Sequence, residues 1–335
     1  MKLTAPVRYV GVDEALGRLP GALVVTDENV ARHYAGRILE GSPVLTLPSG
    51  ESTKSLRHLE ILWSWLAAQG STRNSKIAAL GGGVVGDLAG FAAATYMRGI
   101  EVVQVPTTLM AMVDSAHGGK TGINLKEGKN LAGAFYAPSE VVVAVGFLST
   151  LPRREFLSGT AEVWKYGAIS LPGLFGRLEA SPLEPGSPGL AKVVQECVRA
   201  KLACVRADPL ERKGLRSSLN FGHTVGHAIE NLAGYGTLLH GEAVSIGMVA
   251  EAALGERLGW TCNGLAARLR QGLQRQGLPV KVPEGMDPAG LVEQMARDKK
   301  RTGDGLSFSL VTELGECKLV EGVAEGEVLA SLDSR

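Results

Sequence analysis

Three of the chain's six histidines lie close together, and their spacing is typical of a metal site. His223 and His227 are four residues apart, and His240 follows them. On an α-helix, residues four apart lie on one face about one turn apart. Neutral imidazole is the commonest metal-ligand side chain, and a third ligand often comes from another segment. The local pattern therefore predicts a catalytic metal site with His223 and His227 as paired ligands. The alternative is a helix with two capping or core histidines.

A glycine-rich segment at residues 81–86 has the pattern G-x-G-x-x-G between an apolar run and a helical pattern. Glycine lets the backbone approach a pyrophosphate, and the helix N-terminus favours its negative charge. The acidic residue expected about 20 positions later should end the next strand. Glu101 instead begins that strand, so a flexible turn remains the alternative. Asp87, in the first turn of the helix, either caps the helix or binds a ribose hydroxyl.

A second segment, residues 114–130, places lysines and asparagines among glycines. It is not a P-loop, because Asp114 and Ser115 stand where G-x-x-x-x-G-K-[ST] requires its first glycine. Its backbone N–H and ammonium groups suit an oxygen-rich anionic small molecule. Elsewhere, Glu162 and Lys165 are one helical turn apart and, taken alone, read as a surface ion pair. Three further residues read alone as surface polar residues: Lys201, Arg216 and Asn220.

The elements that must position these residues fall into two parts. Residues 1–150 alternate β-rich runs with helical patterns, which predicts a parallel sheet with helices on its faces. The expected strands are residues 22–26, 43–47, 76–80, 101–105 and 141–145, and a helix is expected at 54–68. Residues 151–335 carry helical patterns at 153–169, 190–206, 217–232, 242–258, 265–276 and 291–300, a loop at 181–188, and a terminal hairpin near 306–311 and 318–320.

We therefore expect an α/β N-terminal nucleotide-binding domain with a mainly parallel sheet and, apart from the hairpin, an all-helical C-terminal domain, with a ligand cleft between them. The formal net charge of the 335 residues is +1, which gives no argument for nucleic acid or an anionic membrane as partner. No signal-peptide pattern or membrane-length apolar run is present in the sequence. The four cysteines lack a CxxC pattern, so free thiols in a reducing cytoplasm are expected.

In order along the chain, these segments resemble the 3-dehydroquinate synthase family from about Asp27 to Lys300. The segments that carry the resemblance are residues 81–87, 98–99, 106–109, 114–115, 118–122, 128–130, 151–155, 161–165, 219–224, 226–228, 240–243 and 298–300. The resemblance implies a homodimeric, cytoplasmic enzyme of the shikimate pathway of aromatic amino-acid biosynthesis. It implies NAD and a divalent metal, Zn2+ or Co2+, as cofactors and a sugar phosphate as substrate.

The implied reaction converts 3-deoxy-D-arabino-heptulosonate 7-phosphate to 3-dehydroquinate and phosphate. It proceeds by transient oxidation with NAD, phosphate elimination, reduction and intramolecular aldol closure. The implied metal ligands are Glu162, His223 and His240, so the resemblance moves His227 to the substrate side.

The resemblance also assigns the remaining site residues. The implied substrate contacts are Arg98 (from the partner subunit, to the phosphate), Asp114, Lys120, Asn130, Lys201, Arg216, Asn220, His227 and Lys299. Catalytic roles are implied for Lys120, Lys165, Lys201, Arg216, Asn220 and His227. The implied NAD contacts are Asp27, Glu51, Lys54, Gly82, Gly83, Asp87, Thr107, Thr108, Lys129, Phe147, Leu148, Ser149 and Thr150.

The sequence departs from the family pattern at Ala144, His117 and Pro209, and His117 would change the electrostatics of the substrate loop if it titrates. Two other activities share the implied cofactors. One is another sugar phosphate cyclase, acting on sedoheptulose 7-phosphate or glucose 6-phosphate. The other is an NAD- and metal-dependent polyol dehydrogenase that releases NADH. A carboxylate-bearing substrate is favoured by the joint presence of Lys201, Arg216, Asn220, His227 and Lys299.

Overall fold

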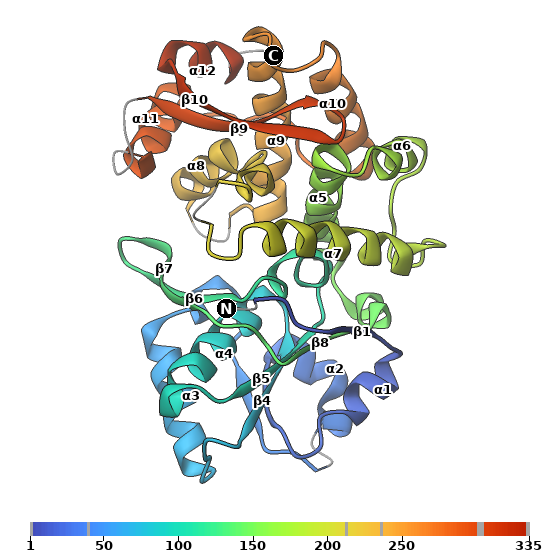
Figure 1. The fold of residues 1–335 in the computed structure, drawn as a ribbon, viewed down its shortest axis with the longest axis vertical. Helices are drawn as coiled ribbons and strands as arrows, with labels where there is room; N and C mark the ends of the chain where they lie inside the picture. The colour runs from blue at the N-terminus through green and yellow to red at the C-terminus, as the bar shows by residue number, and fades with distance from the viewer. Residues whose placement is uncertain (1–2, 39–40, 212–213, 235–236, 300–304, 333–335) are drawn as a thin grey trace. The chain divides into compact units, whose positions relative to one another are not determined.

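The computed structural model describes residues 3–38, 41–211, 214–234, 237–299 and 305–332, with only the backbone for 297–299. The chain forms two compact units (Figure 1). One comprises Met1–Pro152 and Pro188–Leu210, and the other Arg153–Ser187 and Glu211–Arg335. Helix α7, Leu190–Ala207, thus belongs to the first unit. The domain boundary expected at residue 150 stays a prediction. Within the described ranges, no helix combines the length and apolarity needed to cross a membrane.

A six-stranded sheet in the order β1-β8-β5-β4-β2-β3 forms the centre of the first unit. All five strand pairings are parallel, and the central strands are nearly continuous apolar runs, as expected where helices cover both faces of a sheet. The five predicted strands are confirmed, and the three-residue β1 is additional. The strands are β1 Val7–Tyr9, β2 Leu23–Asp27, β3 Val44–Leu47, β4 Lys76–Gly81, β5 Glu101–Pro106 and β8 Glu140–Val143.

The strand order places a topological switch between β2 and β4. From β2 the chain runs outward to β3, and it then returns to the other side of β2 as β4. In open parallel sheets, ligands bind beyond the carboxyl ends of the strands at such a point. The helices of this half are α1 Val12–Gly17, α2 Glu28–Ile38, α3 Leu56–Ala68 and α4 Gly83–Thr95, with short helical turns η1 Glu51–Thr53 and η2 Tyr96–Arg98.

The lysine- and glycine-rich segment, for which the sequence indicated only a ligand-binding stretch, is structured. It contains the π-helical turn η3 Ala111–Ser115 and an antiparallel hairpin of β6 Lys120–Leu125 and β7 Gly128–Phe135. Gly122 and Gly133 face each other across this hairpin, and a Cβ atom on Gly133 would lie 2.2 Å from the Thr121 carbonyl oxygen. The glycines therefore allow the two strands to approach closely. The turn η4, Val145–Thr150, follows β8.

The second unit is mainly helical, and the expected terminal hairpin is present. Its core includes residues of α8, α9, α11, α12 and the β9–β10 hairpin. The predicted helix at 217–232 is interrupted at Gly222, whose φ of 81° is a left-handed conformation. The elements are α5 Arg153–Ile169, α6 Pro172–Ala180, η5 Ser217–Asn220, α8 His223–Ala233, α9 His240–Arg257, α10 Leu265–Gln276, α11 Pro288–Lys299, β9 Leu306–Glu313, β10 Glu316–Val323 and α12 Glu325–Leu332.

Candidate active site

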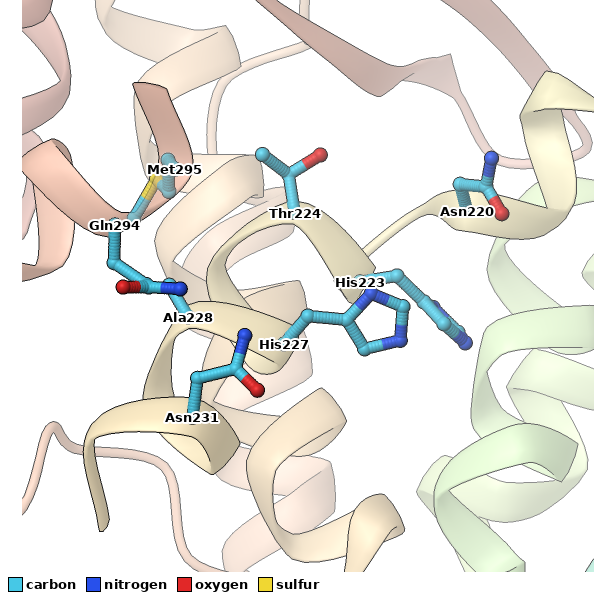
Figure 2. Close-up of a pocket in the computed structure, with 8 residues that line it drawn as sticks. All are labelled: Asn220, His223, Thr224, His227, Ala228, Asn231, Gln294 and Met295. Atoms are coloured by element: carbon cyan, nitrogen blue, oxygen red, sulfur yellow. The ribbon is translucent and has the colours of Figure 1, made fainter. Parts of the chain in front are cut away.

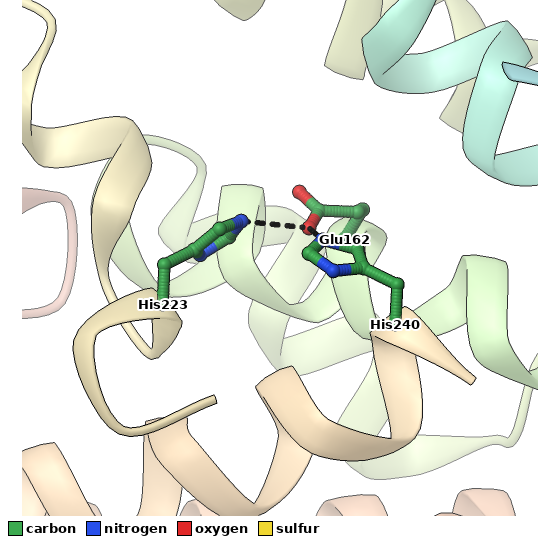
Figure 3. Close-up of side chains that lie close together, drawn as sticks. All are labelled: Glu162, His223 and His240. Atoms are coloured by element: carbon green, nitrogen blue, oxygen red, sulfur yellow. Dashed lines mark ion pairs between the residues drawn. The ribbon is translucent and has the colours of Figure 1, made fainter. Parts of the chain in front are cut away.

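Three helices of the second unit bring Glu162, His223 and His240 together (Figure 3). Their potential ligand atoms all lie within 4.8 Å of one another. The Nε2 atom of His223 lies 3.4 Å from Glu162 Oε1, and Nε2 of His240 lies 3.7 Å from the same oxygen. Two imidazoles and one carboxylate are the donor set of a catalytic zinc site that keeps a position open for substrate. The residues present therefore fit a divalent metal.

A close crossing of α5 and α9 sets the distance between Glu162 and His240. The backbone N–H of Gly241 donates to Ser158 Oγ at 3.0 Å, and Ser158 lies one turn before Glu162 on α5. A Cβ atom on Gly241 would lie 1.8 Å from the Ser158 carbonyl oxygen. Only glycine allows this approach, so the residue beside His240 fixes where α9 begins relative to Glu162.

Helices α8 and α9 also meet through glycines. A Cβ atom on Gly247 would lie 2.0 Å from the Gly222 carbonyl oxygen, and one on Gly226 would lie 3.2 Å from Val244 backbone atoms. Gly222 immediately precedes His223, the first residue of α8. The backbone contact therefore sets the position of His223 beside the helix that carries His240.

The carboxylate of Glu162, one of the three candidate ligands, is buried and has a positively charged partner. Glu162 and Lys165 form an ion pair, and their side chains are only 1% and 2% exposed. Reading this pair in isolation as a surface pair was therefore wrong. Burial, and then the positive charge of Lys165, hold the pKa of His223 well below its usual range. His223 is thus neutral and keeps a nitrogen lone pair for a metal.

Glu230 orients His240 from the side opposite Glu162. Its Oε2 lies 3.0 Å from His240 Nδ1, which leaves Nε2 directed toward Glu162. Burial lowers the pKa of His240, but the neighbouring carboxylates of Glu162 and Glu230 outweigh it and raise the pKa to about 9. A carboxylate on the second nitrogen of a ligating histidine is a common arrangement around protein metals, since it fixes the tautomer and the ring orientation.

A second possible grouping is His227, Glu230 and His240. It shares His240 with the first, and a neutral imidazole offers only one nitrogen lone pair. Since Glu230 accepts the hydrogen bond of Nδ1–H, Nε2 is the nitrogen that would give up its proton to bind a metal, which favours the grouping with Glu162. Within the described residues, no grouping of three ligands contains both His223 and His227. The helical spacing indicated correctly that the two rings are neighbours, 5.3 Å apart by their centroids.

A pocket lies beside His223, between η5, α8 and α11 (Figure 2). Two of the substrate residues expected from the resemblance, Asn220 and His227, line it. Asn231 and Gln294 also line it, and neither is among the residues expected from the sequence. Asn231 is four residues after His227, so helical spacing contained a signal for it. Gln294 comes from α11, and no local pattern in the sequence links it to the histidines.

Of the three residues read alone as surface polar residues, two are buried. Lys201 is 7% exposed and Arg216 is 2% exposed, whereas Asn220 is exposed. Lys201 Nζ lies 2.8 Å from Asp114 Oδ1, and Arg216 Nε lies 3.3 Å from Glu211 Oε1. Tertiary packing thus places two cations in the interior, where they suit a buried anionic ligand.

The other substrate candidates are more accessible. Lys120, Asn130 and Arg98 are exposed, and the last two have left-handed φ values of 57° and 67°. The side chain of Lys299 lies outside the described residues. The substrate candidates therefore come from both units, with Arg98, Asp114, Lys120, Asn130 and Lys201 in the first and Arg216, Asn220 and His227 in the second.

The nucleotide candidates of the first unit follow the carboxyl ends of its strands. Lys54 Nζ lies 2.5 Å from Asp87 Oδ2, so Asp87 forms an ion pair with Lys54. Burial raises the pKa of Asp87, and the charge of Lys54 opposes this shift. Glu51 Oε1 accepts a hydrogen bond of 2.7 Å from the side-chain amide of Asn124. Asp27 Oδ1 accepts backbone N–H groups from the first turn of α2, so this oxygen caps that helix.

The start of α4 fits a dinucleotide phosphate. A Cβ atom on Gly82 would lie 3.0 Å from Thr108 Cγ2, and one on Gly83 would lie 3.0 Å from Ser115 Oγ. No side chain caps α4, so its first N–H groups are directed at the space beyond it. Two buried hydroxyls near this turn, Thr107 Oγ1 and Ser115 Oγ, have no hydrogen-bond partner among the described residues. Buried polar atoms of this kind are typical of a site completed by a ligand.

The remaining candidates for NAD lie on β7 and in η4. Lys129 is partly buried on β7. Phe147 and Leu148 are buried in the core, so only their backbone is available to a ligand. Ser149 is exposed, and the Thr150 hydroxyl lies 3.2 Å from the Tyr34 hydroxyl.

Comparisons of the sequence with known proteins identify one family. The 3-dehydroquinate synthase N-terminal family model matches residues 44–158, and the C-terminal model matches residues 159–301. The chain is 48% identical over 315 residues to the 3-dehydroquinate synthase of Geobacter metallireducens, covering 91% of this chain and 86% of the relative.

Two solved structures have the same fold. One is 2-epi-5-epi-valiolone synthase from Streptomyces hygroscopicus subsp. jinggangensis with NAD+ and Zn2+ bound, at 27% identity and a TM-score of 0.91, covering 99% of this chain and 96% of that chain. The other is 2-deoxy-scyllo-inosose synthase complexed with carbaglucose-6-phosphate, NAD+ and Co2+, at 27% identity and a TM-score of 0.85, covering 97% and 95%.

Proposed function

The chain belongs to the 3-dehydroquinate synthase family, and we propose that it converts 3-deoxy-D-arabino-heptulosonate 7-phosphate to 3-dehydroquinate and phosphate. The observation that carries the choice of substrate is that the chain is markedly more similar to 3-dehydroquinate synthases than to the two cyclases named for other products. NAD and Zn2+ or Co2+ are the proposed cofactors, since the grouping of Glu162, His223 and His240 and the start of α4 fit them.

The proposed cofactors supply what amino-acid side chains lack. A divalent metal bound at Glu162, His223 and His240 would supply Lewis acidity to a substrate hydroxyl, and NAD would supply a hydride acceptor that is regenerated within one turnover. The remaining work is done by side chains that bind and orient the substrate, because a multistep reaction on one bound molecule depends on positioning.

The proposed role of each candidate residue follows from its charge and its hydrogen-bonding groups. Lys165 keeps the buried Glu162 ionised, so that the carboxylate remains a ligand. Arg216 offers the planar, bidentate donor group that suits a carboxylate, and Lys201 and Lys120 offer ammonium groups to anionic oxygens. Asn220 and His227 line the pocket beside His223, where they are placed to hydrogen-bond substrate hydroxyls. Each of these roles is part of the proposal.

A phosphate-release assay tests the proposed reaction. The purified protein is incubated with NAD and Zn2+ or Co2+ and with each of three substrates: the heptulosonate phosphate, sedoheptulose 7-phosphate and glucose 6-phosphate. We expect phosphate release from the heptulosonate phosphate alone, without accumulation of NADH. Release from another sugar phosphate would indicate a different cyclase. Stoichiometric NADH would indicate a polyol dehydrogenase and would contradict the proposal.

We also propose that the enzyme is a cytoplasmic homodimer, as the family resemblance implies. The four cysteines are all free thiols, which suits a reducing compartment. Sedimentation velocity is expected to give about twice the chain mass of 35.1 kDa. A monomer at the assay concentration would contradict the dimer and, with it, the proposed contribution of Arg98 to the partner's site.

A further inference from the structure

Helix α8, which begins with His223, has no capping side chain of its own. Its N-cap residue is Gly222, which carries no side chain and has a left-handed φ of 81°. The first N–H groups of any helix lack partners within the helix, and a buried helix start needs acceptors from elsewhere. Here the missing acceptors come from another helix.

Glu251 of α9 supplies these acceptors. Its Oε2 accepts the N–H of Gly222 at 2.7 Å, and its Oε1 accepts the N–H of Val225 at 3.1 Å. The residue is 0% exposed. A carboxylate at a helix N-terminus is favoured by both the hydrogen bonds and the helix dipole. Both oxygens therefore hold the turn of backbone that contains His223.

We infer that Glu251 is a positioning residue of the metal centre, acting through the start of α8 on His223. Helix α9 begins with His240 and carries Glu251 eleven residues later. The same rigid helix therefore places one imidazole directly and the other through a carboxylate that caps α8. This inference rests on the proposed metal site of Glu162, His223 and His240.

The structure contains a matched control for this role. Glu256, also on α9, accepts the N–H of Ala266 at Oε1 with a distance of 2.7 Å, in the first turn of α10. Helix α10 carries none of the candidate metal ligands. Glu256 is partly buried and accepts one N–H group, so a change there removes a carboxylate of α9 from another helix start without touching the start of α8.

The experiment compares E251Q, E251D and E256Q with the wild type. Glutamine keeps the size of the side chain but removes the charge and turns an N–H donor toward a backbone N–H. The measurements are the Zn2+ dissociation constant, by competition with a chromophoric chelator, and the visible absorption spectrum of the Co2+-loaded protein. We expect E251Q to bind Zn2+ on the order of 10-fold more weakly, with an altered Co2+ spectrum, as for other residues that support metal ligands. E251D keeps the charge on a shorter side chain and is expected to lie between E251Q and wild type.

E256Q is expected to melt at a lower temperature than the wild type while retaining its Zn2+ affinity and Co2+ spectrum. A folded E251Q with wild-type affinity and spectrum would overturn the inference, and so would equal losses in E251Q and E256Q. If E251Q does not fold, wild-type affinity in E251D would overturn it. Failure of the wild type itself to bind Zn2+ or Co2+ would instead refute the proposed function.

Discussion

His117 is a buried histidine, and we predict from its charge state how the free energy of unfolding changes in acid. It is 3% exposed, and its Nε2–H donates to the Met112 carbonyl oxygen at 2.9 Å. Burial is the largest influence on its pKa and lowers it from 6.5 to about 4. The positive charge of Lys201 adds to this shift, whereas the hydrogen bond to Met112 and the negative charge of Asp114 oppose it.

The sign and size of the effect follow from proton linkage. Between about pH 4 and about pH 6.5, the unfolded chain protonates His117 and the folded protein does not, so stability falls as pH falls through this window. Above about pH 6.5, His117 is neutral in both the folded and the unfolded state, so it lowers the free energy of unfolding very little there. With these two pKa values, the loss between ~pH 7.5 and ~pH 5 is about 2 kcal/mol.

The assay compares the free energy of unfolding of wild type and His117→Gln in urea at these two pH values. Glutamine retains a side-chain N–H for Met112 but does not titrate, and the contributions of other residues cancel in the difference. We expect the wild type to lose about 2 kcal/mol more than the variant on acidification. An equal loss in both proteins, or a larger loss in the variant, would refute the reasoning. The neutral ring also means that His117 adds no charge to the substrate loop near neutral pH.

Three further predictions concern the metal centre. We expect His223→Ala and His240→Ala to be purified nearly free of metal and His227→Ala to retain it; equal metal contents by atomic emission would contradict the assigned ligands. Glu230→Gln should weaken Zn2+ binding by roughly 10- to 100-fold, because His240 loses its orienting acceptor; wild-type affinity in a chelator competition would count against this role. Gly247→Ala should lower stability by about 1–3 kcal/mol or more in urea unfolding, because its Cβ meets the Gly222 carbonyl oxygen; an unchanged midpoint would show that α8 and α9 can separate without cost.

Local periodicity predicted much of the fold. The apolar runs gave the five main strands, and the helical pattern at 153–169 matches α5 residue for residue. The break between η5 and α8 is not predicted by the sequence, because the helical pattern continues through Gly222, whose left-handed φ of 81° is seen only in the structure. The β6–β7 hairpin is not predicted, because glycines interrupt the alternation of apolar and polar residues that indicates a strand.

The candidate site depended on information that spacing does not contain. Helical spacing identified His223 and His227 as neighbours, but a residue 61 positions before His223 supplies the carboxylate of the grouping, Glu162. Its pair with Lys165 has the spacing of an ordinary surface ion pair, and only the packing of α5 among the other elements of the second unit buries it. The family resemblance supplied Glu162, whereas Glu251 and Gln294 had no signal of either kind.

The crossings at Gly241 and Gly247 have a consequence for how the sequence can change. At both points the contact is between backbone atoms. Side-chain substitutions elsewhere do not change the size of these atoms, so the distance between the helices stays fixed. Buried apolar residues of α9, such as Ile246 and Val249, can therefore exchange for others of similar volume at a cost in stability but with little displacement of the histidines. The interior packing of the second unit can thus change while the distances among Glu162, His223 and His240 stay nearly the same.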